Sequence, residues 1–398
     1  VGPIVAIRKN LDRRWQGTVS WFWEVETFKV ESLTNVSISP NGEHVLSGSE
    51  NGFAQLRDKT GEILRTFDGH TGIVRASFNP QGTHVLTYSE DGIARIWDLK
   101  INSAVTLEGH SSAINYAEYS RDGNYILTAS DDQTIRIWDA SGEHLNTLSD
   151  PQQEVVHATF SPDSQYVVGT IGSKGGIVAL WSIESQKASI VIRSGTSQVG
   201  TFSEDGKYIL TTNSDAKAIE LLEWQPLLEI GKKQEALTLV VYFQSLEAEA
   251  GSITAPEVLI HKEEELSWLS DTTDFGLALN LLPKLSNCTI NPTGSCFSKA
   301  RVSPDGQSLL YPDGDKAFLI DLAGNELATF EGHDNDVHRA IFSSDGNQIL
   351  TYSSDATARL WDIEGNNIAI LRGHKNVIYS GKYSDDDRTI ITTSENEI

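Results

Sequence analysis

The chain has 398 residues, of which 55 are acidic and 31 basic, and its formal net charge is −24. An excess of this size argues against a general surface for the nucleic-acid backbone, so we expect no nucleic-acid partner. Hydrophobic residues make up 39% of the chain, enough for a core, but no run approaches 18 apolar residues, so no membrane span is expected.

The two cysteines, Cys288 and Cys296, are too few for a disulfide framework, and we expect two thiols, with a loop disulfide as the alternative. The N-terminal residues lack the long apolar centre of a signal peptide, and we expect a cytoplasmic protein. The chain contains no methionine and stops in the middle of a repeat, so we expect a piece of a longer polypeptide.

The first residues carry little repeat signal. Residues 1–17 match no repeat and are assigned as an N-terminal segment. Residues 18–30 alternate apolar and polar side chains, which predicts one or two strands. The first recognisable unit begins at Leu33 and is degenerate, because Arg57-Asp58 stands where later units have Trp-Asp.

The stretch from Gly69 to Asp139 holds nearly the same unit twice. The Gly69-His70 pair recurs after 40 residues, and the Trp97-Asp98 pair recurs after 41. Short β-type runs such as HVLTYS and YILTAS alternate with turn formers such as NPQG and SRDG. A unit of this length and content resembles the WD-repeat β-propeller family. The resemblance implies an all-β ring of four-stranded antiparallel blades.

Later units depart from this pattern and then return to it. The fourth unit ends at Trp181-Ser182, and the fifth, up to residue 224, has lost both signatures. Residues 225–296 match no repeat. Two helical stripes predict a partly helical insertion between blades five and six, either packed on the flank or binding a partner; they consist of Leu239, Phe243, Leu246 and Ala250, and of Leu259, Leu266 and Leu269.

The repeats resume over 297–398. The sixth unit has Ile320-Asp321, the seventh is nearly ideal, and the eighth opens at Ile378 and stops before its third strand. The propeller blades are thus assigned to 18–224 and 297–398. Counting the innermost strands predicts eight blades, with residues 18–30 completing the last one; a seven-blade ring is the alternative.

Four polar residues recur at fixed places in three units. The family resemblance implies that they form a hydrogen-bond network inside each blade, in which serine joins tryptophan and histidine. Because the set recurs at the spacing of the repeat, we interpret it as structural and not as a hydrolase site, and the spacing of the histidines predicts no metal site. The twelve residues are His70, Ser89, Asp91, Trp97, His110, Ser130, Asp132, Trp138, His333, Ser353, Asp355 and Trp361.

We expect a non-catalytic platform, without cofactor, that binds proteins or peptides, including acidic segments, as a monomeric ring. The binding face is predicted where the inner strands begin, at Asn35, Arg75, Tyr116, His157, Lys299, Arg339 and Ser380, with the turn residues Glu90, Asp131 and Ser354 as weaker candidates. The alternative is an enzyme with its site in the channel or in the insertion, near His261, Glu263–Glu265 and Asp274.

Overall fold

The computed structural model describes most of the repeat region and a small part of the insertion. The described residues are 2–11, 21–30, 32–101, 103–149, 153–172, 177–185, 189–193, 200–213, 218–225, 228, 239–242, 258–259, 300–321 and 325–394. No helix in this part of the chain is long and apolar enough to cross a membrane.

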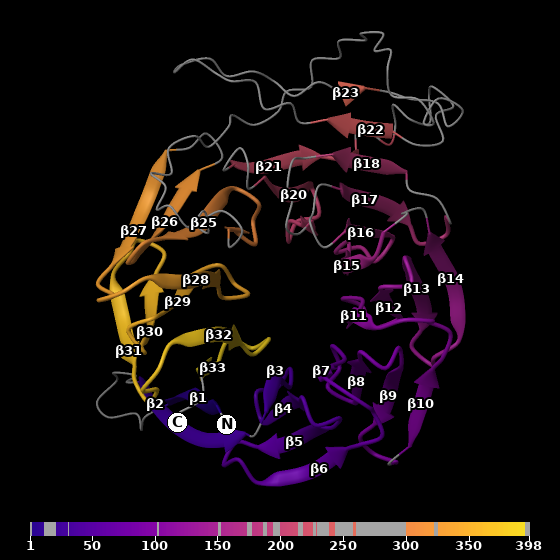
Figure 1. Cartoon of the computed structure of the whole chain (residues 1–398). Coiled ribbons are helices and arrows are strands. Elements are labelled where there is room, and N and C mark those ends of the chain that lie inside the picture. The colour runs from indigo at the N-terminus through magenta and orange to yellow at the C-terminus, as the bar shows by residue number, and fades with distance from the viewer. Residues whose placement is uncertain are drawn as a thin grey trace.

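The strands form eight antiparallel sheets, with one parallel pair, around a central channel (Figure 1). We number the sheets one to eight in the order of their innermost strands. The complete sheets one, two, three, six and seven each contain four consecutive strands. Their strands are β3 (Leu33–Ile38), β4 (His44–Ser49), β5 (Ala54–Asp58) and β6 (Ile63–Phe67); β7 (Val74–Phe78), β8 (His84–Ser89), β9 (Ala94–Asp98) and β10 (Ala104–Leu107); β11 (Ile114–Tyr119), β12 (Tyr125–Ser130), β13 (Thr134–Asp139) and β14 (His144–Ser149); β24 (Arg301–Val302), β25 (Ser308–Asp313), β26 (Lys316–Asp321) and β27 (Glu326–Glu331); and β28 (Val337–Phe342), β29 (Gln348–Ser353), β30 (Ala358–Asp362) and β31 (Asn367–Leu371).

The eighth sheet joins the two ends of the chain. Its order is β2-β1-β33-β32, where β32 (Ile378–Tyr383) and β33 (Thr389–Ser394) pair with β1 (Gly2–Leu11) and β2 (Trp21–Val30). Residues 18–30 therefore supply only the outermost strand. Its third strand comes from β1, within the segment 1–17 that the sequence left without a repeat, and this corrects that assignment.

The fourth and fifth sheets depart from the four-stranded form. The fourth contains β15 (Val155–Phe160), β16 (Tyr166–Ile171), β17 (Ile177–Ser182) and β18 (Ile190–Arg193), and is extended by β22 (Leu239–Tyr242) and β23 (Val258–Leu259). Among the described residues, the fifth contains only β19 (Thr201–Phe202), β20 (Tyr208–Asn213) and β21 (Ala218–Glu223). Among the described residues, six sheets are thus four-stranded blades, and the predictions of eight or seven such blades are corrected to six.

The insertion differs from the helical prediction where it is described. Leu239 begins a strand that pairs in parallel with β18, and Leu259 ends one that pairs with β22. Both residues were placed on helical stripes. The remaining members of those stripes lie outside the described residues.

Buried apolar clusters connect each sheet to the next and close the ring. Each of eight clusters is shared by two consecutive sheets. Leu127 of β12, for example, packs with Val155 and Trp181 of the fourth sheet. The cluster of Val36, Val45 and Ile391 joins the eighth sheet to the first. Because every sheet buries both faces, the hydrophobic effect stabilises the ring as one continuous core.

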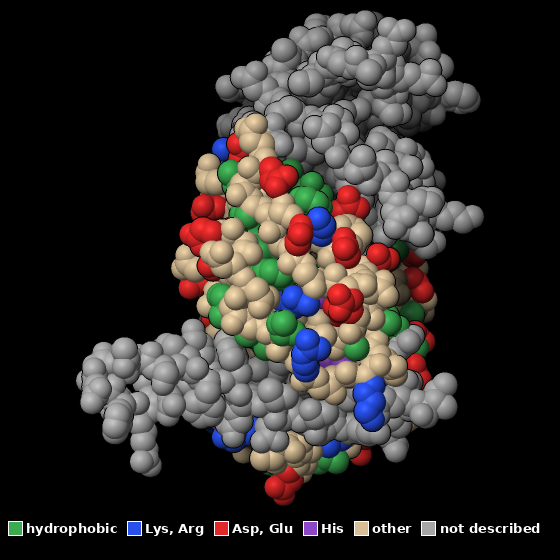
Figure 2. Space-filling model, turned by 90° about the vertical axis from the view of Figure 1, so that its left-hand side faces the viewer, with side chains coloured by type: hydrophobic (Ala, Val, Ile, Leu, Met, Phe, Trp, Pro, Cys, Tyr) green, Lys and Arg blue, Asp and Glu red, His purple; other side chains and the backbone are tan. Residues whose placement is uncertain are grey.

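A serine or asparagine fixes the turn between the first and second strands of each sheet. Ser120 Oγ donates a hydrogen bond to Asp122 Oδ1 (2.6 Å) and accepts one from the amide of Tyr125 (2.9 Å). Gly123 completes this turn with a φ of 76°, a conformation that favours glycine. Aspartates at the equivalent place in other sheets, such as Asp163 and Asp205, contribute to the acidity of the protein. Acidic side chains are spread over the flank shown in Figure 2 rather than gathered in one patch.

Candidate functional site

The recurring polar residues form a hydrogen-bonded chain inside the blade. In the third sheet, Trp138 Nε1 donates to Thr128 Oγ1 (3.0 Å), His110 Nε2 lies 2.7 Å from the same oxygen, and His110 Nδ1 lies 2.7 Å from Asp132 Oδ2. Tryptophan only donates and a carboxylate only accepts. The threonine hydroxyl therefore donates to histidine Nε2, and Nδ1–H donates to the aspartate. The second and seventh sheets repeat the arrangement around Thr87 and Thr351.

The predicted role of serine in this network is wrong. Threonine, two residues before the serine, joins tryptophan and histidine. Ser130 Oγ instead accepts a hydrogen bond from the amide of Asp132 (3.1 Å) and donates one to the carbonyl of Ser112 (3.2 Å). Serine therefore connects the turn after the second strand to the Gly-His turn. The signal was present in the sequence, since threonine recurs at one spacing in HVLTYS, YILTAS and QILTYS.

The network has no access for a substrate. The side chains of His70, His110 and His333 are 0% exposed. Burial lowers the pKa of His333 more than Asp355 raises it, which keeps the imidazole neutral. Burial would raise the pKa of Asp355, but hydrogen bonds from Thr357 and His333 outweigh it and lower the pKa to about 2. The network therefore holds the blade together and offers no hydrolytic chemistry.

Two other sheets lack one residue of the hydrogen-bonded network. In the closing sheet, His374 Nε2 lies 2.8 Å from Thr392 Oγ1 and its Nδ1 lies 2.9 Å from Ser394 Oγ. In the fourth sheet, Gly169 takes the place of the threonine and the indole of Trp181 fills the space. A Cβ at Gly169 would lie 3.0 Å from Trp181 Cζ3, and the buried Trp181 Nε1 has no hydrogen-bond partner.

The predicted partner-binding residues fall into three structural groups. Asn35 connects the first and second sheets. Its side-chain Nδ2 donates to the carbonyl of Ala76 (2.8 Å), and its Oδ1 accepts from the backbone amide of Ala76 (2.9 Å). Tyr116 and His157 stack on each other with ring centroids 4.2 Å apart, and burial lowers the pKa of His157 to about 4.

Of the predicted residues that the structure describes, only Arg75, Arg339 and Ser380 remain candidates for binding a partner. Arg339 is exposed, whereas Arg75 and Ser380 are half-buried. All three lie at the Gly-His face, which we define as the end of the ring that carries the turns 69–73, 109–113, 332–336 and 373–377. Lys299 lies outside the described residues.

The predicted partner-binding residues form a first ring near the start of the inner strands. A second ring of residues lines the channel two positions further along the same strands, and sequence reasoning missed it. Alternate side chains of a strand point to the same side, so this ring faces the channel as the first does. It is formed by Ser37, Ser77, Glu118, Thr159, Thr201, Arg301, Ile341 and Lys382.

Glu118 is the acidic member of this ring. Its Oε1 accepts hydrogen bonds from Thr159 Oγ1 (2.8 Å) and the Phe160 amide (2.9 Å), and its Oε2 accepts one from the Tyr116 hydroxyl (3.0 Å). Burial raises the pKa of Glu118 despite these donors. The carboxylate is therefore already engaged by its own neighbours.

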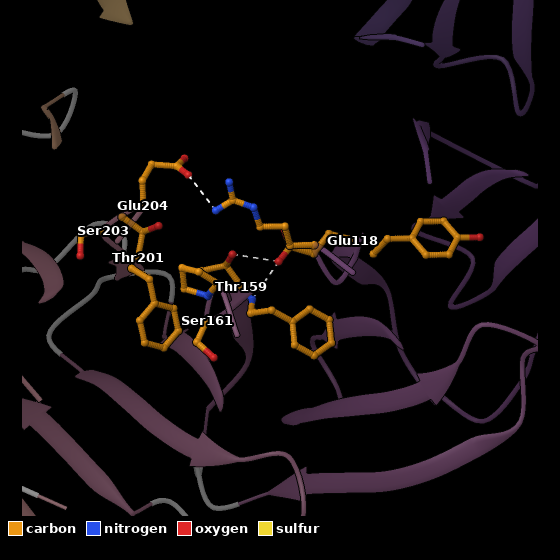
Figure 3. Close-up of a pocket in the computed structure, with 11 residues that line it drawn as sticks. Glu118, Thr159, Ser161, Thr201, Ser203 and Glu204 are labelled. Carbon is orange, nitrogen blue, oxygen red and sulfur yellow. Dashed lines mark hydrogen bonds and ion pairs between the residues drawn. The ribbon is translucent and has the colours of Figure 1, made fainter. Parts of the chain in front are cut away.

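Two cavities open beside Glu118. One, of about 230 Å³, lies among the inner strands of sheets three to five, where Thr159, Ser161, Thr201 and Ser203 contribute hydroxyls (Figure 3). An ion pair of 3.5 Å between Arg121 and Glu204 lies at its rim. The other, of about 840 Å³, runs along the channel past Glu118 and Lys382 to the turns opposite the Gly-His face.

The remaining candidates are structural or lie outside the described residues. Asp131 accepts a hydrogen bond from Asn115 Nδ2 (2.6 Å), and Ser354 Oγ lies 2.7 Å from His338 Nε2. Glu90 is exposed. Within the described part of the chain, no group of three histidine, cysteine or acidic residues is placed to hold a metal ion. The candidates that lie outside the described residues are His261, Glu263–Glu265, Asp274, Cys288 and Cys296.

Comparison with known proteins supports the repeat reading. The family model "WD domain, G-beta repeat" matches residues 61–98, 102–139 and 324–362. The segments end at the Trp-Asp pairs of the second, third and seventh units. No curated protein matches the chain. With three matched repeats and a closed ring of antiparallel sheets, the chain belongs to the WD-repeat β-propeller family.

Proposed function

We propose that this protein is a non-catalytic platform that binds an acidic segment of a partner protein across the Gly-His face. Propellers of this family are generally scaffolds for protein interaction. The buried networks described above serve the fold, so the binding chemistry is assigned to side chains at the channel mouth.

The observation that carries the proposal is the surface around Arg339. This exposed guanidinium has no acidic partner within the described part of the chain. It lies on β28 next to His338, whose ring centroid is 6.0 Å from that of Tyr379 on β32, and Tyr379 is 49% exposed. Arginine and tyrosine are the residue types enriched among the residues that dominate binding energy.

Electrostatics favours an acidic partner over a basic one at this surface. Arg75 lies on β7, at the position of its strand that matches Arg339 on β28, so the channel mouth carries two guanidiniums on separate sheets. On a protein of charge −24, these are local sites where a carboxylate finds a complementary charge.

The test is a binding titration by fluorescence anisotropy. The probe is a labelled peptide of alternating glutamate and glycine, and a lysine-glycine peptide is the matched control for charge. We expect the acidic peptide to bind the wild-type protein at low salt and to bind at least about tenfold more weakly to Arg75→Glu/Arg339→Glu. Lys100→Glu, which alters an exposed lysine between β9 and β10, is the control variant. Equal affinity of both variants for the acidic peptide would refute the proposal.

A further inference from the structure

Tyr379 differs from the other exposed apolar residues in its place in the fold. It is 49% exposed and lies near the start of β32, an innermost strand that begins directly after the turn 373–377 of the Gly-His face. Within the described part of the chain, the other exposed large apolar side chains lie on outermost strands or in the turn before one; they are Ile63, Leu64, Ile101, Val105, Leu145, Leu327, Ile368 and Ile370. The exposed ring of Tyr379 therefore belongs to the Gly-His face and not to the flank.

The ring of Tyr379 lies beside the ring of His338 in the preceding sheet. Their centroids are 6.0 Å apart and their planes are inclined by 41°. Each residue is the second of its strand, β28 or β32, and in both strands the pairing register shifts at that residue, which marks a β-bulge. A bulge leaves one residue out of the ladder and redirects its side chain. The same irregularity in neighbouring sheets thus brings the two rings together.

A hydrogen bond orients the imidazole of His338 before any partner arrives. His338 Nε2 lies 2.7 Å from Ser354 Oγ, in the turn after β29. The amide of Ser354 donates to the carbonyl of Asp336 (2.9 Å), which fixes the turn itself. Tyr379 therefore packs against a ring that is already in position. A surface that is ordered in the free protein loses less conformational entropy when a partner docks on it.

Two exposed rings at this separation favour an aromatic side chain as their ligand. Aromatic rings pack at tilted or offset angles with centroids about 4.5–7 Å apart, and such contacts add to the gain from burying apolar surface. An acidic side chain gains neither of these terms. Arg339, the residue after His338, attracts acidic groups in the proposed function, so the aromatic ligand is assigned to the same partner segment.

The separation of neighbouring sheets sets the spacing within that segment. Arg339 lies on β28 and Tyr379 on β32, the inner strands of sheets seven and eight. Packed sheets are about 10 Å apart, and an extended chain advances about 3.4 Å per residue. An acidic residue at Arg339 and an aromatic residue at Tyr379 would thus stand about three positions apart.

We infer that Tyr379 and His338 form a subsite for an aromatic side chain of the partner, about three positions from the acidic residue. The subsite presupposes the proposed function, in which Arg339 binds the acidic residue. It adds a second determinant to the partner, so that an acidic segment without an aromatic residue is a weaker ligand than one that contains it.

The experiment compares two labelled peptides by fluorescence anisotropy with the full chain. The first is the alternating glutamate-glycine peptide. The second carries tryptophan in place of one central glycine, which puts glutamates one and three positions away on either side. We expect the tryptophan peptide to bind the wild type about tenfold more tightly. Equal affinities would overturn the aromatic subsite and leave the proposed function standing, whereas absence of binding by both peptides would overturn both.

A third peptide controls for attraction of tryptophan alone. It is the lysine-glycine peptide with the same central tryptophan, and we expect it to bind at least about tenfold more weakly than the acidic tryptophan peptide. If it bound equally well, the aromatic side chain would act without its acidic neighbours, and the inferred link between the two determinants would be wrong.

Variants assign the gain in affinity to the two rings. In Tyr379→Ser the two acidic peptides should bind with nearly equal affinity. Leu145→Ser, which alters a residue that is also 49% exposed but lies on the outermost strand β14, should keep the tenfold ratio. Tyr379→Phe should keep the ratio as well, because the ring remains. The ratio is measured on one variant at a time, so a general loss of affinity does not change it.

A second variant tests the same subsite from the other ring. His338→Asn removes the imidazole but keeps a polar group for Ser354, and it should lower the ratio of the two affinities at least about threefold. A tenfold ratio that persisted in both Tyr379→Ser and His338→Asn would overturn the inference.

Discussion

Replacing Thr351 with valine tests the buried network most directly. The substitution keeps the shape of the side chain but removes the hydroxyl that accepts from Trp361 Nε1 and lies 2.8 Å from His333 Nε2. Both groups would remain buried without a partner, at about 1–3 kcal/mol each. We therefore expect the free energy of unfolding to fall by about 2–5 kcal/mol, a large part of the about 5–15 kcal/mol typical of folded proteins.

The assay is urea unfolding followed by tryptophan fluorescence and far-ultraviolet circular dichroism. A loss of this size should lower the urea midpoint by about 1 M or more. Thr106→Val, on the exposed strand β10, is the matched control and should leave the midpoint nearly unchanged. If both variants lowered the midpoint equally, the hydroxyl of Thr351 would have no special role and the reasoning would fail.

Three further outcomes follow from the same structure. Trp181→Phe should cost about 1–3 kcal/mol less than Trp361→Phe in urea unfolding, because the Trp181 N–H already lacks a partner; equal costs would contradict this. The pKa of His157 is about 4 in the fold and about 6.5 in an unfolded chain, so unfolding takes up a proton and stability falls as pH drops from about 6.5 to 4, by at most about 3 kcal/mol. His157→Asn should flatten this part of the stability profile, and an unchanged slope would count against the assignment. Ala6→Pro should lower the unfolding temperature, because β1 is paired on both sides and the amide that proline removes would donate to one neighbouring strand whichever side it faces. Lys59→Pro, in an exposed turn, should be tolerated. Equal effects of the two variants would argue against the closing sheet.

The sequence was sufficient for the repeat and for most strands, because each unit carries its own alternation and turn residues. The strands of the second, third and seventh units coincide with the runs that the pattern indicated. The position of Thr128 was also readable, because it recurs with its unit. It was missed since serine has the same hydrogen-bonding groups and lies nearer the conspicuous aspartate.

Other features depend on contacts that no local pattern contains. The strand β1 has partners at the opposite end of the chain, so nothing near residues 2–11 indicated its place. The run around Leu239 is apolar and rich in valine, and short runs of this kind fit a helix or a strand until a neighbour such as β18 offers its edge. The second ring could have been anticipated from strand alternation, because it lies two positions beyond the predicted binding residues on the same strands.

Closure through the eighth sheet also constrains how the molecule is made. The hairpin of β1 and β2 is synthesised before the other strands of the ring, yet its partner β33 leaves the ribosome only after nearly all of them. Until then the hairpin has an open edge, and joining it to β33 closes a loop of almost the whole chain, a slow step for folding. Any nascent chain that stalls before residue 389 leaves a ring that cannot seal, with two edges free to recruit a strand from another molecule.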